Sequence, residues 1–348
     1  MSAQVSDLNV DFNVPLPAPA LLMHELPRTD AEAEVVIKGR RRLEEILHGK
    51  SDRFMVIVGP CSIHDPKMGI EYAEKLAKLR EEVSDQLELV MRVYFEKPRT
   101  NVGWKGLIMD PDMDDSANLP KGLRIARQLL SDVLDRGVPT ATEFLDPVTP
   151  QYIGDLICWA AIGARTVESQ THRQMASGLS MPVGMKNTTY GGMSAVVNAL
   201  KAAIAPQTFF GISPEGVASM VKTKGNQFCH TVLRGGEDGP NYSAEEIAKV
   251  SAQLEKGKVL GAIMVDASHA NCSKDHNKMP GVFADVVAQR AAGNKNIVGA
   301  MLESHLVAGN QKVSSDRSKL VYGQSVTDPC IDWETTERIV REAAEKLS

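Results

Sequence analysis

The segment Phe54-Met-Val-Ile-Val-Gly-Pro-Cys61 is an apolar run of strand length that ends in a turn and a thiol. Seven further runs of this kind follow along the chain, and each ends at or next to a residue that can bind a phosphate, a carboxylate or a metal. In chain order these residues are Arg92, Glu143, Arg165, Lys186, Arg234, Asp266 with His269, and Glu303. Buried parallel strands are apolar throughout, and a (β/α)8 barrel builds one active site from the C-terminal ends of its eight strands. We therefore predict an α/β protein with a (β/α)8 (TIM) barrel and a single active site at its C-terminal mouth.

Helical patterns separate these runs, as crossovers between parallel strands require. The expected helices cover residues 31–48, 66–83, 122–136, 150–159, 172–179, 193–204, 244–256, 280–293 and 334–347. Two parts lie outside the alternation. A Pro-rich arm and a helix occupy residues 1–48 and are expected to serve assembly or regulation, before a catalytic barrel over residues 49–348. Two short β-prone runs at about 207–224 flank Pro214-Glu-Gly216 and predict a β-hairpin inserted into the barrel.

Composition narrows the class of function. The chain has 348 residues and a formal net charge of −5, which argues against a nucleic-acid or anionic-membrane surface. We expect neither a membrane span nor a signal peptide. The 5 cysteines form no CxxC pair, which argues against a disulfide framework and indicates a reducing, cytoplasmic location.

Four of the strand-exit and late-loop residues have side chains that bind metals, namely Cys61, His269, Glu303 and Asp328. One thiolate, one imidazole and two carboxylates suit a divalent transition metal such as Mn, Fe, Co or Zn better than Mg or Ca. Taken singly, a buried cysteine or histidine is more often an ordinary core residue. It is their common position at the predicted mouth that favours a metal site.

Six cations are also expected at this mouth, namely Arg92, Lys97, Arg99, Arg165, Lys186 and Arg234. Any one of them could be solvated or paired with an acid, but six together indicate an anionic small molecule with phosphate or carboxylate groups. Glu143 is either their counter-ion or a group that positions water. The chain has no Walker A loop, no GxGxxG after the first strand, no GxSxG and no HExxH. The sequence therefore gives no support for nucleotide binding, nicotinamide binding or a serine hydrolase.

Longer motifs make the chain resemble a known family. They include Gly59-Pro-Cys-Ser-Ile-His-Asp65, Arg92-Val-Tyr-Phe-Glu-Lys-Pro-Arg-Thr100, Gly163-Ala-Arg-Thr166, Leu233-Arg-Gly-Gly236, Ser268-His-Ala-Asn271 and Ser325-Val-Thr-Asp328. In this order and over most of its length, the chain resembles the class I alpha 3-deoxy-D-arabino-heptulosonate 7-phosphate (DAHP) synthases. The resemblance implies a metal-dependent transferase that condenses phosphoenolpyruvate with D-erythrose 4-phosphate in the first step of the shikimate pathway.

The resemblance also implies a role for each matching residue. Cys61, His269, Glu303 and Asp328 would bind the metal. Arg92 and Lys186 would hold the phosphoenolpyruvate carboxylate, and Arg165, Arg234 and the Ala164 backbone its phosphate. Lys97, Arg99 and Thr100 would bind erythrose 4-phosphate. The catalytic residues would be Lys97, Glu143, Lys186, His269 and Asp328, with Glu143 and Lys186 positioning the attacking water.

The same resemblance implies feedback inhibition by an aromatic amino acid and assembly into a homodimer or homotetramer. The effector residues would be Pro150, Gln151, Met175, Leu179, Ser180, Phe209, Gly211 and Val221. A serine at position 211 would go with phenylalanine, whereas Gly211 leaves room for a phenol hydroxyl and favours tyrosine, with tryptophan second. The chain departs from the family pattern at Thr188 and Tyr190, where a glycine and an aspartate are usual. Two other functions stay open: a 3-deoxy-octulosonate 8-phosphate synthase-like enzyme, and a catalytically inactive barrel that binds an amino acid.

Overall fold

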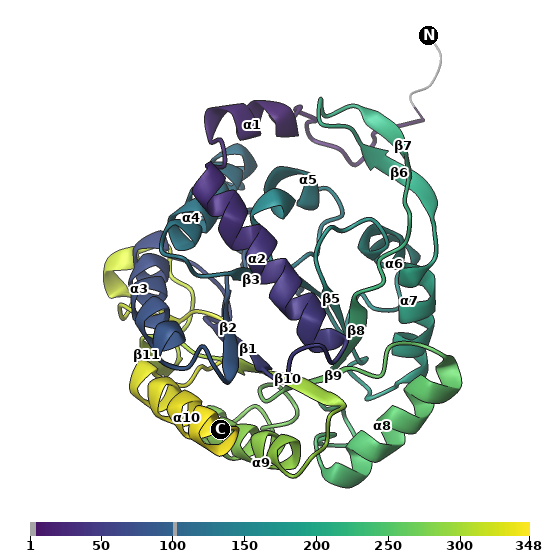
Figure 1. Ribbon diagram of the computed structural model, residues 1–348. Coiled ribbons are helices and arrows are strands. Elements are labelled where there is room, and N and C mark those ends of the chain that lie inside the picture. The colour runs from purple at the N-terminus through teal and green to yellow at the C-terminus, as the bar shows by residue number, and fades with distance from the viewer. Residues whose placement is uncertain (1–4, 100–102) are drawn as a thin grey trace.

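Eight parallel strands form a closed barrel in this computed structural model, which describes residues 5–99 and 103–348. The order around the barrel is β1-β10-β9-β8-β5-β4-β3-β2 (Figure 1). The strands are β1 (Phe54–Gly59), β2 (Leu87–Arg92), β3 (Thr140–Glu143), β4 (Trp159–Ile162), β5 (Val183–Lys186), β8 (Cys229–Leu233), β9 (Ile263–Asp266) and β10 (Ile297–Glu303). All of their residues are buried, as expected for strands covered by helices on one face and by barrel contents on the other. The predicted fold class is confirmed.

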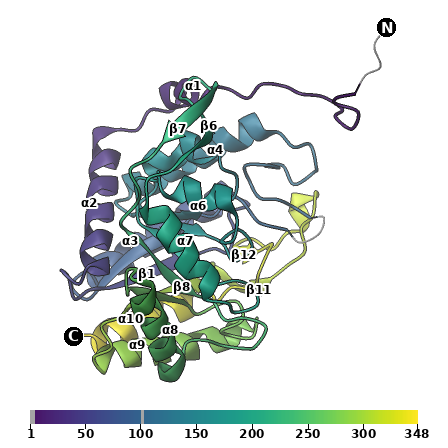
Figure 2. The ribbon, with the colours of Figure 1, turned by 90° about the vertical axis from the view of Figure 1, so that its right-hand side faces the viewer.

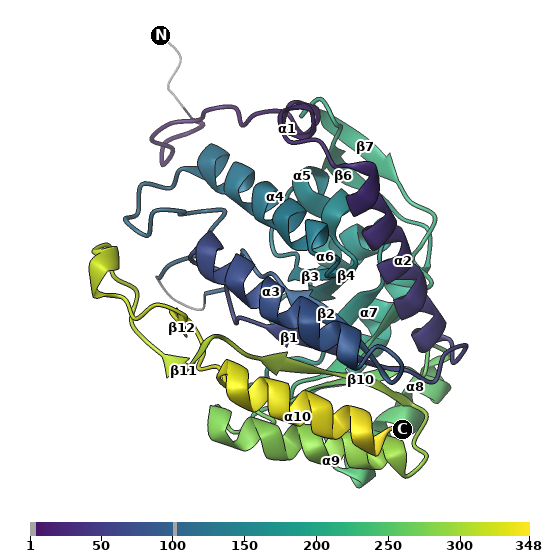
Figure 3. The same cartoon turned by 60° about the vertical axis from the view of Figure 1, so that its left-hand side comes forward.

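Helices surround the barrel, and Figure 3 shows α4, α3, α10 and α9 along one flank. Their bounds are α3 (Pro66–Glu82), α4 (Leu119–Asp135), α5 (Pro150–Ile153), α6 (Gln170–Ala176), α7 (Ser194–Ile204), α8 (Ala244–Gly257), α9 (Met279–Ala291) and α10 (Trp333–Lys346). The sequence sets several of their starts. Asp65 caps α3 before Pro66, and the Asp332 side chain caps α10. Tyr72 of α3 packs edge-on against Trp333 of α10, which joins the last helix to the ring.

Helix α2 (Asp30–Leu47) closes the N-terminal end of the barrel, where Figure 1 shows it crossing the strands. It begins with a capping box between Thr29 and Glu32. Gly39 lets it approach the strand starts, because an added Cβ would lie 3.0 Å from the Cys158 sulfur. Arg40 then donates to the carbonyl of Ile157 at 2.8 Å. Because α2 covers this end of the barrel, we look for the functional site at the opposite end, where the strands finish (Figure 2).

The inserted hairpin consists of β6 (Thr208–Ile212) and β7 (Ala218–Lys222), which pair antiparallel between α7 and β8. This confirms the hairpin predicted at about 207–224. Helix α1 (Pro19–Glu25) packs on its tip, where the Ala20 amide donates to the Pro214 carbonyl at 2.8 Å. The arm before α1 extends away from the body (Figures 1 and 3).

One expectation about secondary structure needs correction. The helix predicted over residues 150–159 is only α5 plus the 3-10 turn η1 (Gly154–Leu156), and Trp159 begins β4. The α-helix stops because the Tyr152 carbonyl accepts from Arg127 instead. The sequence analysis made no assignment for the segment after β10, which contains the small parallel pair β11 (Val307–Asn310) and β12 (Gln324–Ser325) with the turn η3 (Arg317–Lys319) between them. A further turn, η2 (His276–Lys278), precedes α9.

Candidate active site

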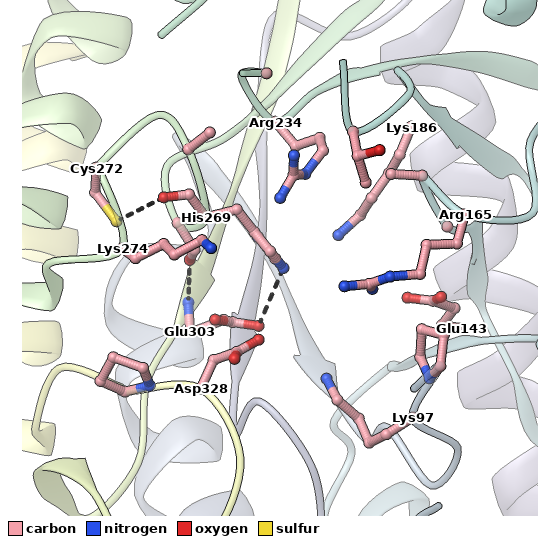
Figure 4. Close-up of a pocket in the computed structure, with 18 of the residues that line it drawn as sticks. Lys97, Glu143, Arg165, Lys186, Arg234, His269, Cys272, Lys274, Glu303 and Asp328 are labelled. Carbon is pink, nitrogen blue, oxygen red and sulfur yellow. Dashed lines mark hydrogen bonds and ion pairs between the residues drawn. The ribbon is translucent and has the colours of Figure 1, made fainter. Parts of the chain in front are cut away.

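A cavity of about 420 Å³ opens at the C-terminal end of the barrel. Figure 4 shows its two walls, with Lys186, Arg165 and Glu143 on one side and His269, Glu303 and Asp328 on the other. Of the residues predicted for the site, the cavity is lined by Lys97, Arg99, Glu143, Ala164, Arg165, Lys186, Arg234, His269, Glu303 and Asp328. Cys61 and Arg92 are fully buried and contact this lining, and Thr100 lies outside the described residues.

The predicted metal ligands lie together. Ligand atoms of Cys61, Glu303 and Asp328 are all within 4.8 Å of one another. The His269 Nε2 atom is 3.8 Å from Oε1 of Glu303, and the Cys61 sulfur is 3.7 Å from Oδ2 of Asp328. A soft sulfur, an imidazole nitrogen and carboxylate oxygens within this space could hold a divalent transition metal.

Local structure aims these side chains at one point. Glu303 ends β10, and Cys61 follows β1, which pairs with β10 in register Gly59 to Glu303. His269 adopts a left-handed backbone conformation with φ of 56°, which is uncommon for a residue other than glycine and often marks a functional site.

Asp328 comes from the long segment after β10, and hydrogen bonds near it fix that segment. The hydroxyls of Thr327 and Ser62 are 2.7 Å apart, and the Thr327 carbonyl accepts from Asn310 Nδ2 at 2.8 Å. Ser62 directly follows Cys61, so the contact brings the fourth predicted ligand to the first. Asp328 lines the cavity and is exposed to solvent there.

Electrostatics at this cluster favour a bound cation. Burial, followed by the nearby charge of Glu303, raises the pKa of the Cys61 thiol to about 12. Burial also opposes ionisation of Asp328, but Lys97, His269, the Cys61 hydrogen bond and Arg99 together outweigh it and lower the pKa of that carboxyl. Anionic groups this close repel one another, and a divalent cation between them would remove the penalty.

A chain of ion pairs centred on Asp266, the last residue of β9, joins Lys186 of one wall to His269 of the other. Oδ2 of Asp266 accepts from Lys186 Nζ at 2.8 Å and lies 2.9 Å from Nδ1 of His269. Burial opposes ionisation of Asp266, but His269 and Lys186 hold its pKa well below the usual range. Asp266 thereby fixes which His269 nitrogen faces Glu303. Sequence reasoning noted it as a strand-exit residue but gave it no role.

Glu143, the last residue of β3, lies beside Arg165 at the edge of the cavity (Figure 4). It is packed against Gly163, where an added Cβ would lie 2.2 Å from Glu143 Oε1. A glycine at position 163 is therefore required for this position of the carboxylate. Among the described residues, neither Arg165 nor Arg234 forms an ion pair with a carboxylate. Both guanidinium groups are consequently available to an anionic ligand.

Comparison with known proteins agrees with this geometry. Residues 29–341 match the model of the DAHP synthetase I family. The chain belongs to this family. It is 51% identical over 344 residues to the Phe-sensitive phospho-2-dehydro-3-deoxyheptonate aldolase of Escherichia coli K12, an alignment that covers 99% of this chain and 98% of the relative. It is 49% identical over 333 residues to the Tyr-sensitive enzyme of Salmonella typhimurium LT2, covering 96% and 93%. A solved phospho-2-dehydro-3-deoxyheptonate aldolase structure from Francisella tularensis SCHU S4 aligns with a TM-score of 0.95 and 47% identity, over 97% and 98% of the two chains. The family resemblance inferred from the motifs is confirmed.

Within the DAHP synthetase I family, the departures at 188 and 190 raised a question about the shape of the loop after β5. Thr188 is buried, and its hydroxyl accepts from the Gly192 amide at 3.0 Å. The Glu237 amide donates to the Thr189 carbonyl at 3.1 Å, which joins this loop to the one after β8. Tyr190 is 69% exposed and points away from the core. The loop is thus compact with threonine in place of glycine.

Arg92 differs from the simple expectation of a cation at the open mouth. Its Nη2 lies 3.1 Å from Glu303 Oε1, and its guanidinium lies 3.9 Å above the ring of Tyr94. It is only 1% exposed. A direct contact between Arg92 and a substrate carboxylate stays a prediction.

The predicted effector residues lie on the hairpin and the nearby helices. Phe209 pairs with Val221 across the hairpin, and an added Cβ at Gly211 would lie 2.7 Å from Val221 Cγ2. These three positions therefore share one face of the hairpin, and β6 contacts α6, which carries Met175. Pro150 and Gln151 begin α5, which packs against α1, and Leu179 and Ser180 follow α6. That they bind an amino acid stays a prediction.

Proposed function

We propose that the chain condenses phosphoenolpyruvate with D-erythrose 4-phosphate and water to give DAHP and inorganic phosphate, the first step of the shikimate pathway. The observation that carries the proposal is the opposition of two walls in one cavity. Arg165 and Arg234, which have no carboxylate partner among the described residues, and the paired lysines Lys97 and Lys186 line the same cavity of about 420 Å³ as His269, Glu303 and Asp328, with the Cys61 thiol beside them. Such a cavity can hold two phosphorylated molecules beside a metal ion.

A divalent metal at Cys61, His269, Glu303 and Asp328 would supply Lewis acidity toward the aldehyde oxygen of the sugar. The fit rests on the donor set and on the 4.8 Å spacing of three of its ligands. The metal could be Mn, Fe, Co or Zn, which accept mixed sulfur, nitrogen and oxygen ligands.

The cations would bind the anionic groups of the two substrates. Arg165, Arg234 and the Ala164 amide would bind the phosphate of phosphoenolpyruvate, and Lys186 its carboxylate, with Arg92 behind it. Lys97 and Arg99 would bind erythrose 4-phosphate, with Thr100. Together they neutralise two phosphates that would otherwise repel each other, and hold the reacting carbons close.

The proposed reaction forms one carbon–carbon bond and one bond from C2 to the water oxygen, and it breaks the bond from C2 to the phosphate oxygen. C3 of phosphoenolpyruvate attacks the aldehyde carbon, and water, positioned by Glu143 and Lys186, adds to C2. One proton of the water goes to the former aldehyde oxygen, which becomes a hydroxyl, and the other leaves with the phosphate as C2 becomes a ketone. Asp266 keeps the Lys186 ammonium in place for this step through its 2.8 Å contact.

Mixing the protein with phosphoenolpyruvate, erythrose 4-phosphate and Mn²⁺ and following the loss of enol absorbance tests the proposal. We expect turnover that a chelator stops and added divalent metal restores. Turnover with arabinose 5-phosphate but not with erythrose 4-phosphate would instead support an octulosonate-type enzyme. Absence of turnover with both sugars would leave only an amino-acid-binding barrel.

We also propose that tyrosine inhibits the chain, with tryptophan as the second choice. The relatives include both Phe-sensitive and Tyr-sensitive enzymes, so family membership alone does not indicate which amino acid inhibits this chain. The support is Gly211: an added Cβ there would lie 2.7 Å from Val221 Cγ2, so a serine would displace Val221 on the face of the hairpin that carries Phe209. Activity should be titrated against all three aromatic amino acids in the wild type and in Gly211→Ser. A wild type that responds only to phenylalanine would refute the assignment.

The chain is further proposed to form a homodimer or homotetramer. On the outer face of the hairpin, Phe210 is 97% exposed and Met220 is 78% exposed. The arm alternates polar and apolar residues from Asp7 to Val14, with Phe12 76% exposed. Such surfaces are usually covered in an assembly. Light scattering of the full chain and of Phe210→Ser tests this, and a wild-type monomer at micromolar concentration would refute it.

A further inference from the structure

Three asparagine side chains at neighbouring strand exits take no part in the proposed reaction. Asn187 directly follows β5, Asn241 lies between β8 and α8, and Asn271 lies in the loop after β9. Asn187 and Asn271 are almost fully buried, and Asn241 is half-buried. A buried amide group needs hydrogen-bond partners, and all three asparagines find such partners on one short stretch of backbone, residues 233–235.

Asn187 continues the pairing of β5 with β8 beyond the last residues of the two strands. Its backbone amide donates to the Val232 carbonyl at 3.1 Å. Its side chain accepts from the Arg234 amide at 2.8 Å through Oδ1 and donates to the Gly235 carbonyl at 2.8 Å through Nδ2. Only an amide side chain can form this reciprocal pair, since a carboxylate has no hydrogen to donate and an apolar side chain has neither group. The side chain at position 187 therefore fixes where the backbone of Arg234 lies.

The other two asparagines bind the same stretch of backbone. Asn241 Oδ1 accepts from the Gly235 amide at 2.8 Å, and its Nδ2 donates to Oδ1 of Asn187 at 3.3 Å. Asn271 Nδ2 donates to the Leu233 carbonyl at 3.2 Å, and its Oδ1 accepts from the Asn241 amide at 2.8 Å. The backbone of residues 233–235 is thus fixed by three side chains that come from three different loops.

Lys186 and Arg234 reach into the cavity from the neighbouring strands β5 and β8 (Figure 4). Lys186 is held by Asp266, whose Oδ2 lies 2.8 Å from Nζ. Arg234 has no carboxylate partner among the described residues, and its Nη1 lies 3.5 Å from the carbonyl oxygen of Gly235, to which Asn187 also donates. The place of the Arg234 guanidinium therefore depends on the turn that the asparagines fix, and not on an ion pair.

We infer that Asn187 and Asn241 are positioning residues that select a small anion carrying a carboxylate and a phosphate on the same carbon atom. They do so by keeping the Arg234 guanidinium at a fixed separation from the Lys186 ammonium. An anion bound at both ends must match this separation, whereas a lone phosphate has no second end to match. The inference rests on the proposed function, which places the carboxylate at Lys186 and the phosphate at Arg234.

Two unreactive probes, titrated into the full chain with Mn²⁺ in a calorimeter, measure this selectivity. 2-Phosphoglycolate carries both groups on one carbon atom, and inorganic phosphate has no carboxylate. The wild type should bind 2-phosphoglycolate at least about tenfold more tightly, because one more charge-assisted hydrogen bond forms. Asn241→Ala removes two of the side-chain hydrogen bonds without a change of charge, so this ratio should fall toward one. Its affinity for inorganic phosphate should change by no more than about threefold, since both guanidinium groups remain.

Asn187→Asp is a second variant, of nearly the same size as the wild type. It keeps the acceptor for the Arg234 amide but sets two oxygen atoms against each other at the Gly235 carbonyl. Its added negative charge should weaken both probes, so the ratio of the two affinities is compared, and it should again fall toward one. In either variant KM for phosphoenolpyruvate should rise about tenfold, while KM for erythrose 4-phosphate, which would bind Lys97 and Arg99, should stay within about twofold.

Asn226→Ala is the matched control. Asn226 is buried and precedes β8, at the opposite end of this strand from Arg234. Its side chain donates to the Met181 carbonyl at 2.9 Å and accepts from the Phe228 amide at 3.0 Å. The replacement should lower Tm but leave the ratio of the two probe affinities unchanged. An equal loss of the ratio in this control would show that general loosening of the barrel abolishes the selectivity, and it would overturn the inference.

The inference and the proposed function can fail separately, because neither probe is turned over. A ratio that stays at its wild-type value in the folded variants overturns the inference even if the chain makes DAHP. A wild type that binds both probes equally well also overturns it. A ratio that falls as expected in a chain without turnover would support the positioning by the asparagines and remove only the proposed condensation.

Discussion

A single methyl group at Gly163 should displace Glu143 without disturbing the fold. In Gly163→Ala the new Cβ would lie 2.2 Å from Oε1 and 3.0 Å from Cδ of Glu143. The three nearest atoms all belong to this one side chain, and Gly163 does not have a left-handed backbone that an alanine would strain. The carboxylate is the flexible end of its side chain, so it should move and leave the strands in place.

The displacement gives the expected size of the effect. Carbon and oxygen atoms in ordinary contact lie about 3.5 Å apart, so the carboxylate must move by at least about 1 Å. A misplacement of about 1 Å at a reacting centre costs about 100-fold in rate, or about 2.7 kcal/mol in the activation barrier. We expect kcat to fall by about this factor while Tm changes by no more than a few degrees. Steady-state kinetics and thermal unfolding measure the two quantities.

Two further variants make the reasoning refutable. Gly281→Ala adds a methyl group on α9, where nothing lies within 4 Å, and should leave the rate unchanged. If Glu143 alone transmits the effect, Glu143→Ala and the double variant with Gly163→Ala should be equally slow, because the second change has nothing left to displace. A Gly163→Ala enzyme with wild-type kcat would show that the position of Glu143 is irrelevant to the reaction.

Three other predictions follow from buried groups. Cys61→Ala should lose metal-dependent turnover but keep its circular dichroism spectrum, and a variant that is still activated by added metal would contradict the ligand assignment. Glu88→Ala leaves Arg80, now 2.9 Å from the carboxylate, without its carboxylate partner, and should cost about 3–5 kcal/mol in urea unfolding; a loss under about 1 kcal/mol would contradict this. Burial lowers the pKa of His230 to about 4, whereas the unfolded chain protonates near its ordinary value of 6.5, so stability should fall as the pH drops from about 6.5 to about 4, by about 1.4 kcal/mol per pH unit. His230→Gln, which can still accept from Trp159, should reduce this slope in urea titrations, and an unaltered slope would refute the assignment.

The barrel was predictable because its strands carry a signal that does not depend on their neighbours. Each is a short apolar run followed by a polar residue, and six such residues, from Arg92 to Glu303, prove to be the last residue of their strand or adjacent to it. The segment after β10 gave no such signal. Its pair β11–β12 has only two matched positions, and hydrogen bonds from residues distant in the sequence, such as Ser62 to Thr327, hold it in place.

The sequence could not show how deeply each side chain of the site is buried. Strand ends show which residues reach the mouth but not how far each side chain is buried there, because this depends on the stagger between strands. Lys186 lies beside Val232, and Val232 beside Met264, so Asp266 stands two residues further along β9 than the level of Lys186. Only this stagger allows the two side chains to meet.

Pairing distinguishes five of the six predicted cations in a way that their spacing cannot. Arg92 is bound to Glu303, Lys186 to Asp266, and Lys97 lies on the Cys61 sulfur. A substrate that contacts one of these three side chains must share it with the protein group that it already binds. Such side chains are suited to orienting a molecule that other groups have bound. Arg165 and Arg234, within the described part of the chain, have no carboxylate partner and line the cavity. An anion entering the mouth therefore gains most from these two arginines, and the first group they should capture is a phosphate, since its dianion best matches two forked donors.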